Sequence, residues 1–372
     1  MTGKIKILIS GGGTGGHIFP AISIANTLKE KMPECSILFV GAKGRIEEEK
    51  VPAAGYEIKS LPVQGFKRKL AISNLKVVYN LIISLFLARK IVKTYKPDVV
   101  VGVGGYASGP VLWVAARCKI PTLIQEQNSY AGLTNRLLSK RVCKVCVAYD
   151  GLERFFDATK IVLTGNPVRK NILENTISTR RAKEFYSINT NQKVVLILGG
   201  SGGAKQINES VKNAIEKIAQ NKDLTFIWQT GKFYYDKVID FYKKNPLENI
   251  LVKSFLPNMD YAYKAADIVV TRAGAATISE LSLLGKPAIF VPSPNVAENH
   301  QMKNAMNLVD KNAALLVKDS EAPQKLLDTA IALVRDEEKM KILSENIKQM
   351  AFPNADAKIA DEIIHLAKQQ AK

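Results

Sequence analysis

Short apolar runs alternate with stretches of helical periodicity along most of the chain. Residues 5–10 form an apolar-rich run that predicts a buried strand, and a helical pattern follows over residues 20–31. The same order returns in the second half, where an apolar run at 194–198 precedes a helical pattern that continues to Ala219. Strands that alternate with helices in this way predict an α/β fold with parallel sheets.

Loops of small residues follow several predicted strands, and they form two similar sets. They occupy residues 11–17 and 102–109 in the first half, and residues 199–205 and 272–277 in the second. Because ligands bind at the carboxyl ends of parallel strands, each set belongs to a binding edge. The repeat predicts two Rossmann-like domains, residues 1–165 and 166–372, that face each other across a deep cleft. Gly and Pro interrupt the pattern near Gly165, and the last helix is a candidate to pack back on the first domain.

The composition is typical of a soluble globular protein. The 372 residues are 47% hydrophobic and 23% charged, which argues against a disordered, collagenous or coiled-coil chain. We find no secretory signal pattern, and the longest uncharged apolar stretch, residues 77–88, is shorter than the roughly 20 residues that span a bilayer. Four cysteines are too few for a disulfide framework. These features favour the cytoplasm.

The formal net charge of +19 is unevenly distributed. Residues 1–165 contain 24 Lys and Arg against 11 Asp and Glu, whereas residues 166–372 contain 29 against 23. A region of nine basic residues and no acidic residue favours an anionic partner, either a nucleic acid or an anionic membrane surface. These nine are Lys59, Lys67, Arg68, Lys69, Lys76, Arg89, Lys90, Lys93 and Lys96.

The apolar residues between these charges distinguish the two partners. Residues 70–88 predict a helix that is apolar on nearly all sides, whereas a nucleic-acid-binding helix would carry Lys, Arg and polar residues on its second face. We therefore expect no nucleic acid partner, and a helix that lies at a membrane surface. The alternative is that the whole helix is core. One predicted stripe contains Leu81, Leu85, Ala88 and Val92, and the membrane-facing stripe contains Leu75, Val78, Tyr79, Ile82 and Phe86.

The glycine loops suit anion binding better than dinucleotide binding. Residues 11–16 match Gly-x-Gly-x-x-Gly, but the second predicted strand ends in Gly-Ala-Lys43 rather than in the acidic residue that would bind a ribose. The loop at 199–205 lacks the Gly-Lys-Ser/Thr of a P-loop. Glycines still let backbone N–H groups approach an anion at a helix N-terminus. The alternative for any one loop is a tight strand-to-helix turn.

His17 closes the first glycine loop in the first turn of the predicted helix. A histidine there tends to stay neutral, and a neutral imidazole accepts a proton from an alcohol. The alternative is a capping or packing histidine. Cys143 and Cys146 lie in a predicted strand and point to opposite faces, which disfavours a zinc or redox site. We predict no metal site, and since the chain has no Asp-x-Asp, a bound diphosphate would be neutralised by helix ends and Arg or Lys.

Seven motifs follow one another along the chain, at residues 11–20, 102–110, 125–128, 165–169, 199–201, 229–232 and 272–280. In this order they resemble the motifs of the MurG family of peptidoglycan N-acetylglucosaminyltransferases. The resemblance implies a GT-B fold and no tightly bound cofactor, and it leaves assistance by a divalent cation open. It also implies transfer of N-acetylglucosamine from UDP-N-acetylglucosamine to the C4 hydroxyl of undecaprenyl-diphospho-N-acetylmuramoyl-pentapeptide, with inversion. Such a lipid-linked acceptor explains a basic, apolar region that docks on anionic inner-leaflet lipids, peripherally, on the cytoplasmic side of the inner membrane.

The resemblance also implies individual roles. His17 is the expected base and Glu126 is the reserve. Glu280 would accept hydrogen bonds from the ribose, Arg169 would bind the leaving diphosphate, and the Leu256 backbone would meet the uracil. The acceptor diphosphate would rest on Gly12, Gly13, Gly104, Gly105 and Tyr106. The residues expected to bind the donor are Thr14, Gly15, Gly16, Asn128, Arg169, Ser201, Leu256, Ala275, Ala276, Thr277, Ile278, Ser279, Glu280, Gln301 and Asn304.

Two positions depart from the family pattern. Gly202 stands where glutamine commonly follows the serine, and His300 stands where relatives can carry a second glutamine. Two other functions remain as alternatives. A UDP-N-acetylglucosamine 2-epimerase shares the fold and the donor but has no use for a basic, apolar first domain. A non-catalytic nucleotide-sugar-binding subunit would bind the donor without turnover.

Overall fold

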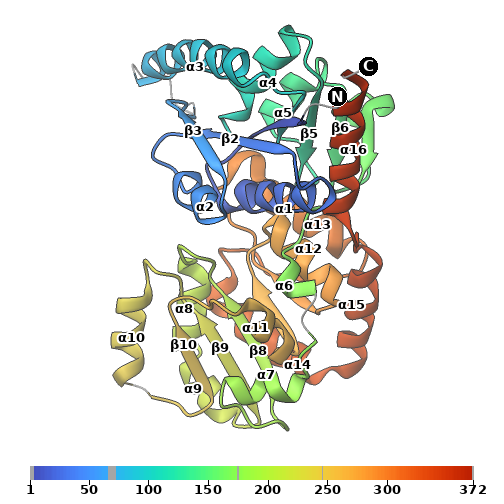
Figure 1. Cartoon of the computed structure of the whole chain (residues 1–372). Coiled ribbons are helices and arrows are strands. Elements are labelled where there is room, and N and C mark those ends of the chain that lie inside the picture. Colours follow the sequence, from blue (N-terminus) through green and yellow to red (C-terminus); the bar gives the residue numbers. More distant parts are fainter. Residues whose placement is uncertain (1–3, 66–72, 174–175, 245, 371–372) are drawn as a thin grey trace. The chain divides into compact units, whose positions relative to one another are not determined.

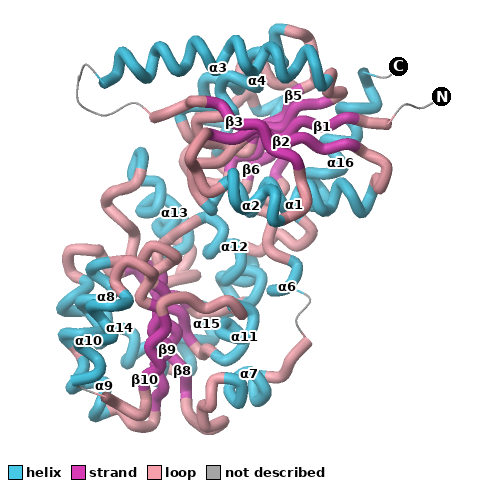
Figure 2. Tube along the Cα trace, turned by 60° about the vertical axis from the view of Figure 1, so that its left-hand side comes forward, coloured by secondary structure: helices cyan, strands magenta, loops and turns pink. Residues whose placement is uncertain are grey.

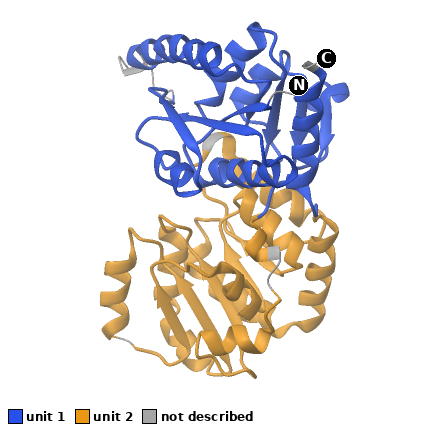
Figure 3. Cartoon of the chain, viewed as in Figure 1, with its two compact units in different colours: residues 1–168, 352–372 blue, residues 169–351 orange. Residues whose placement is uncertain are grey.

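The computed structural model describes residues 4–65, 73–173, 176–244 and 246–370. The chain forms two compact units, residues 1–168 with 352–372 and residues 169–351 (Figure 3). The sequence predicts a second domain of residues 166–372, whose last helix is a candidate to pack on the first domain. In the structure the second unit comprises residues 169–351, and the last helix is part of the first unit. Lys67, Arg68 and Lys69 of the predicted basic region lie outside the described residues.

Unit 1 contains a parallel seven-stranded sheet of order β3-β2-β1-β4-β5-β6-β7 (Figure 1). The central strands are buried on both faces, which explains why their sequences read as apolar runs instead of alternating patterns. Its elements are β1 (Lys6–Ser10), α1 (Gly15–Lys31), β2 (Ser36–Ala42), α2 (Glu47–Ala53), β3 (Glu57–Leu61), α3 (Ser73–Tyr95), β4 (Val99–Gly102), α4 (Ser108–Arg117), β5 (Thr122–Glu126), α5 (Leu133–Ser139), β6 (Lys144–Val147), η1 (Leu152–Arg154), η2 (Ala158–Lys160), β7 (Ile161–Leu163) and α16 (Ala355–Gln370).

The last helix, α16, packs on α1 through apolar and polar contacts. Ile359 and Ile363 are fully buried in the cluster that also contains Ile24 and Leu28 of α1. The Thr27 hydroxyl donates to the Asp356 carboxylate at 2.7 Å. These contacts explain why the chain returns to unit 1 after residue 351.

Unit 2 repeats the plan with a parallel six-stranded sheet of order β10-β9-β8-β11-β12-β13, and Figure 2 shows helices on both sides of these strands. Two parallel α/β units confirm the predicted fold class. The elements are α6 (Lys170–Leu173), α7 (Thr179–Phe185), β8 (Lys193–Leu198), α8 (Lys205–Asn213), α9 (Ile215–Gln220), β9 (Leu224–Gln229), α10 (Tyr235–Lys244), β10 (Ile250–Lys253), α11 (Met259–Ala265), β11 (Ile268–Thr271), α12 (Ala275–Leu284), β12 (Ala288–Phe290), η3 (Ala297–Asn299), α13 (His300–Val309), β13 (Leu315–Leu316), α14 (Ala322–Arg335) and α15 (Glu337–Gln349).

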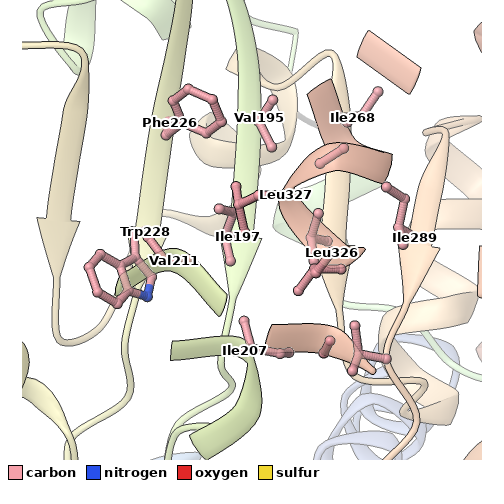
Figure 4. Close-up of a cluster of buried hydrophobic side chains, with 14 of the residues drawn as sticks. Val195, Ile197, Ile207, Val211, Phe226, Trp228, Ile268, Ile289, Leu326 and Leu327 are labelled. Carbon is pink, nitrogen blue, oxygen red and sulfur yellow. The ribbon is translucent and has the colours of Figure 1, made fainter. Parts of the chain in front are cut away.

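The core of unit 2 fixes the loop that follows β8. Apolar side chains of β8, β9 and β11 meet side chains of α8 and α14, among them Ile207 and Leu326 (Figure 4). Buried Trp228 donates its indole N–H to the Asn208 side chain of α8 at 2.9 Å. The start of α8, directly after the glycine loop, is thereby anchored to the sheet.

Candidate active site

Two glycine loops pack against each other at the carboxyl edge of the unit 1 sheet. They follow the neighbouring strands β1 and β4. A Cβ on Gly105 would overlap the Gly12 carbonyl oxygen, and a Cβ on Gly11 would lie 2.9 Å from the Gly104 carbonyl oxygen. Gly104 and Gly105 also have φ of +89° and +81°, which side chains rarely adopt. The fold therefore brings Gly11 and Gly12 of the first loop against Gly104 and Gly105 of the second, at the sheet edge where the sequence predicts both loops.

His17 lies where these loops meet. Its Nδ1 is 3.1 Å from the Thr14 hydroxyl. The imidazole lies against the second loop, because a Cβ on Gly104 would be 2.7 Å from its Cδ2 and 2.9 Å from its Nε2. Only glycine at position 104 leaves room for the His17 ring in this position, so the second glycine loop helps to define where the imidazole lies.

Glu126, at the end of β5, is only 1% exposed and its carboxylate accepts four hydrogen bonds. Oε1 accepts from the Asn128 backbone N–H at 3.0 Å and from the Asn128 side-chain amide at 3.2 Å. Oε2 accepts from Gly132 N–H at 3.0 Å and from the Asn135 amide at 2.8 Å. Burial raises the pKa of Glu126, and these four donors act in the opposite direction. The carboxylate thus holds the segment from Asn128 to Asn135, and the role of Glu126 as reserve base stays a prediction.

Three amide side chains form a buried network behind the glycine loops. Gln127 donates to the Val103 carbonyl at 2.7 Å and to the Gln125 side chain. Gln125 donates to the Asn166 side-chain oxygen at 2.9 Å, and Asn166 donates back to the Gln127 carbonyl at 3.0 Å. Sequence reasoning missed this role of Gln125, Gln127 and Asn166, although all three lie within the motifs.

Tyr106, which is also predicted to contact the acceptor diphosphate, is 54% exposed. Its ring covers Gly65, where a Cβ would overlap it. Tyr106 thus links the second glycine loop to the segment after β3, at the border of the described residues before α3.

In unit 2, Arg169 and Glu280 form an ion pair with each other. Glu280 Oε1 is 2.9 Å from both Nε and Nη2 of Arg169, and Glu280 Oε2 accepts from the buried Tyr263 hydroxyl at 2.9 Å. Desolvation is the largest single influence and lowers the pKa of Arg169, but the charge and hydrogen bond of Glu280, together with Tyr263 and Asp260, outweigh it, so the net pKa is raised. Burial, with Glu280 adding to it, raises the pKa of Tyr263 well above its usual value. The sequence predicted both charged residues in the site but not their pairing.

The other predicted donor residues differ in what they can offer. Ala275, Ala276 and Thr277 form the first turn of α12, whose N-cap Gly274 has no capping side chain. The Ile278 side chain is buried and its N–H donates to the Gly274 carbonyl, and its contact with the donor stays a prediction. Leu256 is also buried, which leaves only its backbone, and Ser279 donates to the Ala275 carbonyl at 3.0 Å.

A cavity of about 440 Å³ lies in unit 2 beside the loops after β8 and β12. Gln301 lines this cavity, and its side-chain oxygen accepts a hydrogen bond from the Ser293 backbone N–H at 2.8 Å. This hydrogen bond fixes the orientation of the Gln301 amide group. Asn304 is fully buried behind it, with its amide 3.4 Å from the Ala273 carbonyl. Ser201 is exposed, and the Phe233 ring lies over Gly202 at the position where the family commonly has glutamine. Across the described residues, no group of three His, Cys, Asp or Glu side chains has metal-site geometry.

The helix α3 divides into a buried and an exposed face. The five residues predicted to face a membrane, Leu75, Val78, Tyr79, Ile82 and Phe86, are each between 44% and 70% exposed. In the other predicted stripe, Ala88 and Val92 are buried, whereas Leu81 is 36% exposed. Val77, which belongs to neither predicted stripe, is also buried. The exposure excludes the alternative that the whole helix is core. Among the helices that the structure describes, none is long and apolar enough to cross a membrane.

Comparisons with known proteins place this fold and site in a class. Models of the N-terminal and C-terminal domains of glycosyltransferase family 28 match residues 7–147 and 194–363. The crystal structure of Acinetobacter baumannii MurG is similar, with a TM-score of 0.77, 28% identity and coverage of 97% of this chain and 99% of that one. UDP-GlcNAc 2-epimerase from Neisseria meningitidis shares the fold alone, at 15% identity and a TM-score of 0.68. The two α/β units with their glycine loops are those of a glycosyltransferase of the GT-B class.

Relatives of full length identify the family. The protein of Parabacteroides distasonis is 52% identical over 363 residues, 98% of each chain. Those of Phocaeicola vulgatus and Flavobacterium psychrophilum are 53% and 48% identical and cover at least 99% of each chain. All three are UDP-N-acetylglucosamine–N-acetylmuramyl-(pentapeptide) pyrophosphoryl-undecaprenol N-acetylglucosamine transferases. The chain belongs to this family, the MurG family, which confirms the resemblance stated on the motifs.

Proposed function

We propose that the protein transfers N-acetylglucosamine from UDP-N-acetylglucosamine to the C4 hydroxyl of undecaprenyl-diphospho-N-acetylmuramoyl-pentapeptide, in peptidoglycan synthesis. The observation that carries this proposal is about 50% identity over full length to transferases of that name. The donor is an α-linked diphosphate and the product a β-1,4 glycoside, so the anomeric carbon inverts. One direct displacement requires one base and stabilisation of the departing UDP.

His17 is the proposed base. The Thr14 hydroxyl orients its ring and Gly104 gives it space, so the imidazole is held at the edge where both glycine loops end. It would take the proton of the acceptor C4 hydroxyl as that oxygen attacks the sugar. Glu126 instead acts by holding Asn128 and the following loop, since its four donors come from that segment.

Unit 1 is the proposed acceptor unit. Gly12, Gly104, Gly105 and Tyr106 lie together with His17, so a diphosphate on these loops would bring the attached sugar near the base. The exposed apolar face of α3 and its basic neighbours would dock the unit on anionic inner-leaflet lipids. The enzyme would then be peripheral, on the cytoplasmic side of the inner membrane, where its polyprenyl-linked substrate lies.

Unit 2 is the proposed donor unit. The uncapped N-terminus of α12 offers N–H groups and its dipole to the UDP diphosphate, close to the Arg169–Glu280 pair. In this proposal the ribose hydroxyls bind Glu280, Arg169 stabilises the leaving diphosphate together with Ser201, and Gln301 orients the sugar. Arg169 can serve both its partner and a phosphate because a guanidinium has five N–H donors.

A transfer assay tests this proposal. Purified full-length protein is incubated with radiolabelled UDP-N-acetylglucosamine, with and without a synthetic lipid I analogue. We expect label in the lipid product only when the acceptor is present. An epimerised nucleotide sugar formed without acceptor would favour the 2-epimerase, and donor binding without transfer would favour a non-catalytic subunit; either result would overturn the proposal.

A further inference from the structure

Glu47, the first residue of α2, is a fully buried carboxylate beneath the first glycine loop. Its Oε1 accepts the Ala42 backbone N–H at 2.9 Å, at the end of β2. Its Oε2 accepts the Gly13 backbone N–H, also at 2.9 Å. One side chain therefore joins the end of a core strand to the middle of the loop that precedes His17.

The neighbouring glycines are shaped around this carboxylate. A Cβ on Gly12 would overlap the Glu47 carboxylate, and a Cβ on Gly41 would lie 2.5 Å from its Cγ. A buried carboxylate is costly unless hydrogen bonds compensate for lost solvation, and backbone N–H groups do so efficiently. The glycines at 12 and 41 thus make room for a specific acceptor, which is a use of these residues that differs from phosphate binding.

Short covalent and hydrogen-bonded steps connect Glu47 to the imidazole. Gly13, whose N–H it holds, directly precedes Thr14, and the Thr14 hydroxyl lies 3.1 Å from His17 Nδ1. We propose that Glu47 is a positioning residue that fixes the Gly12–Thr14 turn and thereby the orientation of His17. This inference rests on the proposed function, in which His17 is the base.

The same contact bears on the predicted role of Gly13. Its N–H is already donated to a carboxylate, so a substrate phosphate would have to displace Glu47 or do without that donor. A negative charge under the turn also opposes a diphosphate at that point. The proposal therefore moves the acceptor diphosphate away from Gly13 and toward the second loop at Gly104 and Gly105.

The test compares Glu47→Gln and Glu47→Ala with Glu49→Gln, an exposed glutamate on the same helix, in the full-length protein. Glutamine keeps the size but offers one acceptor oxygen for two N–H donors, and alanine removes both acceptors. Misplacing a catalytic group by about 1 Å costs about 100-fold in rate. We expect kcat to fall roughly 10- to 100-fold for Glu47→Gln and further for Glu47→Ala, with KM for UDP-N-acetylglucosamine and UDP affinity changed less than about twofold. Glu49→Gln should match the wild type.

Two NMR observables that do not depend on turnover accompany the kinetics. In both Glu47 variants the Gly13 amide should exchange faster with solvent and the His17 ring nitrogen resonances should shift, because the turn has lost its anchor. If the His17 resonances and kcat of Glu47→Gln equal those of the wild type, Glu47 does not position His17. If wild-type protein transfers no sugar, the proposed function fails, and the His17 resonances alone decide whether Glu47 sets the ring. Should Glu47→Ala not fold, Glu47→Gln carries the test.

Discussion

The buried glutamates of the two units are held in different ways. In unit 1, Glu47 and Glu126 accept hydrogen bonds from neutral backbone and amide N–H groups that are fixed in the fold. In unit 2, Glu280 pairs with Arg169, a cation whose side chain is 40% exposed. Neutral N–H donors hold a loop in one shape, whereas an exposed guanidinium can share its donors with an arriving phosphate. The glycine loops proposed to hold the acceptor are therefore preorganised, whereas the proposed donor site contains a charge pair that a diphosphate can engage.

Removing the imidazole should give the largest effect. We expect His17→Ala to lower kcat by roughly 100- to 10,000-fold, because the acceptor hydroxyl loses its base. UDP affinity, measured by titration calorimetry, should not change, because the proposed contacts to UDP all lie in unit 2. Nearly normal turnover would remove His17 from the mechanism.

Glu126→Gln tests whether Glu126 acts as a positioning residue or as the catalytic base. The glutamine leaves buried N–H donors without an acceptor, at about 1–3 kcal/mol of stability, and loosens the Asn128 segment. We expect kcat to fall about 10- to 100-fold while the pH–rate profile keeps its shape. Glu153→Gln, at an exposed position of unit 1, is the matched control. Loss of the acid limb of the profile in Glu126→Gln would restore Glu126 as the base.

Glu280→Gln tests the charge pair of unit 2. Loss of a charge-assisted hydrogen bond should weaken UDP binding by about tenfold and blunt the discrimination between UDP and its deoxyribose analogue. Calorimetry on both nucleotides measures this, with Glu345→Gln on the exposed face of α15 as the control. Unchanged affinity for both would place the ribose elsewhere. A similar loss of UDP affinity in Glu126→Gln would contradict the proposal that the contacts to UDP lie in unit 2 alone.

Changes to the exposed face of α3 should act only at lipid surfaces. Replacing Ile82 and Phe86 with serine should reduce binding to phosphatidylglycerol vesicles by roughly tenfold, since two apolar side chains no longer enter the interface. Melting temperature should hold, because both side chains are exposed. Leu163→Ser, at another exposed apolar position of unit 1, is the control. Vesicle binding equal to that of the wild type would refute this docking face.

Much of the fold follows from sequence because its signals are local. Apolar runs and small-residue loops in fixed order predict both parallel sheets and place the loops at the carboxyl edge, whereas the adjacency of β1 and β4 comes from the structure. Helical periodicity likewise separates exposed Phe86 from buried Ala88 on α3.

Other features depend on long-range packing, which one sequence does not encode locally. Glu47 reads as one of three consecutive glutamates, and only the fold reveals that it alone is buried against Gly13. The Arg169–Glu280 pair joins residues 111 positions apart. Ile278 lies inside a motif, but helix hydrogen bonding and burial occupy both its N–H and its side chain.

The configuration and position of the transferred sugar distinguish an inverting transferase from the other candidate functions. Wild-type protein is incubated with ¹³C-labelled UDP-N-acetylglucosamine and a lipid I analogue, and the product is analysed by NMR. We expect one new β-linked N-acetylglucosamine on the C4 oxygen of the muramoyl sugar, with release of UDP. An α-linked product, attachment at another hydroxyl, or free epimerised sugar nucleotide would contradict this expectation.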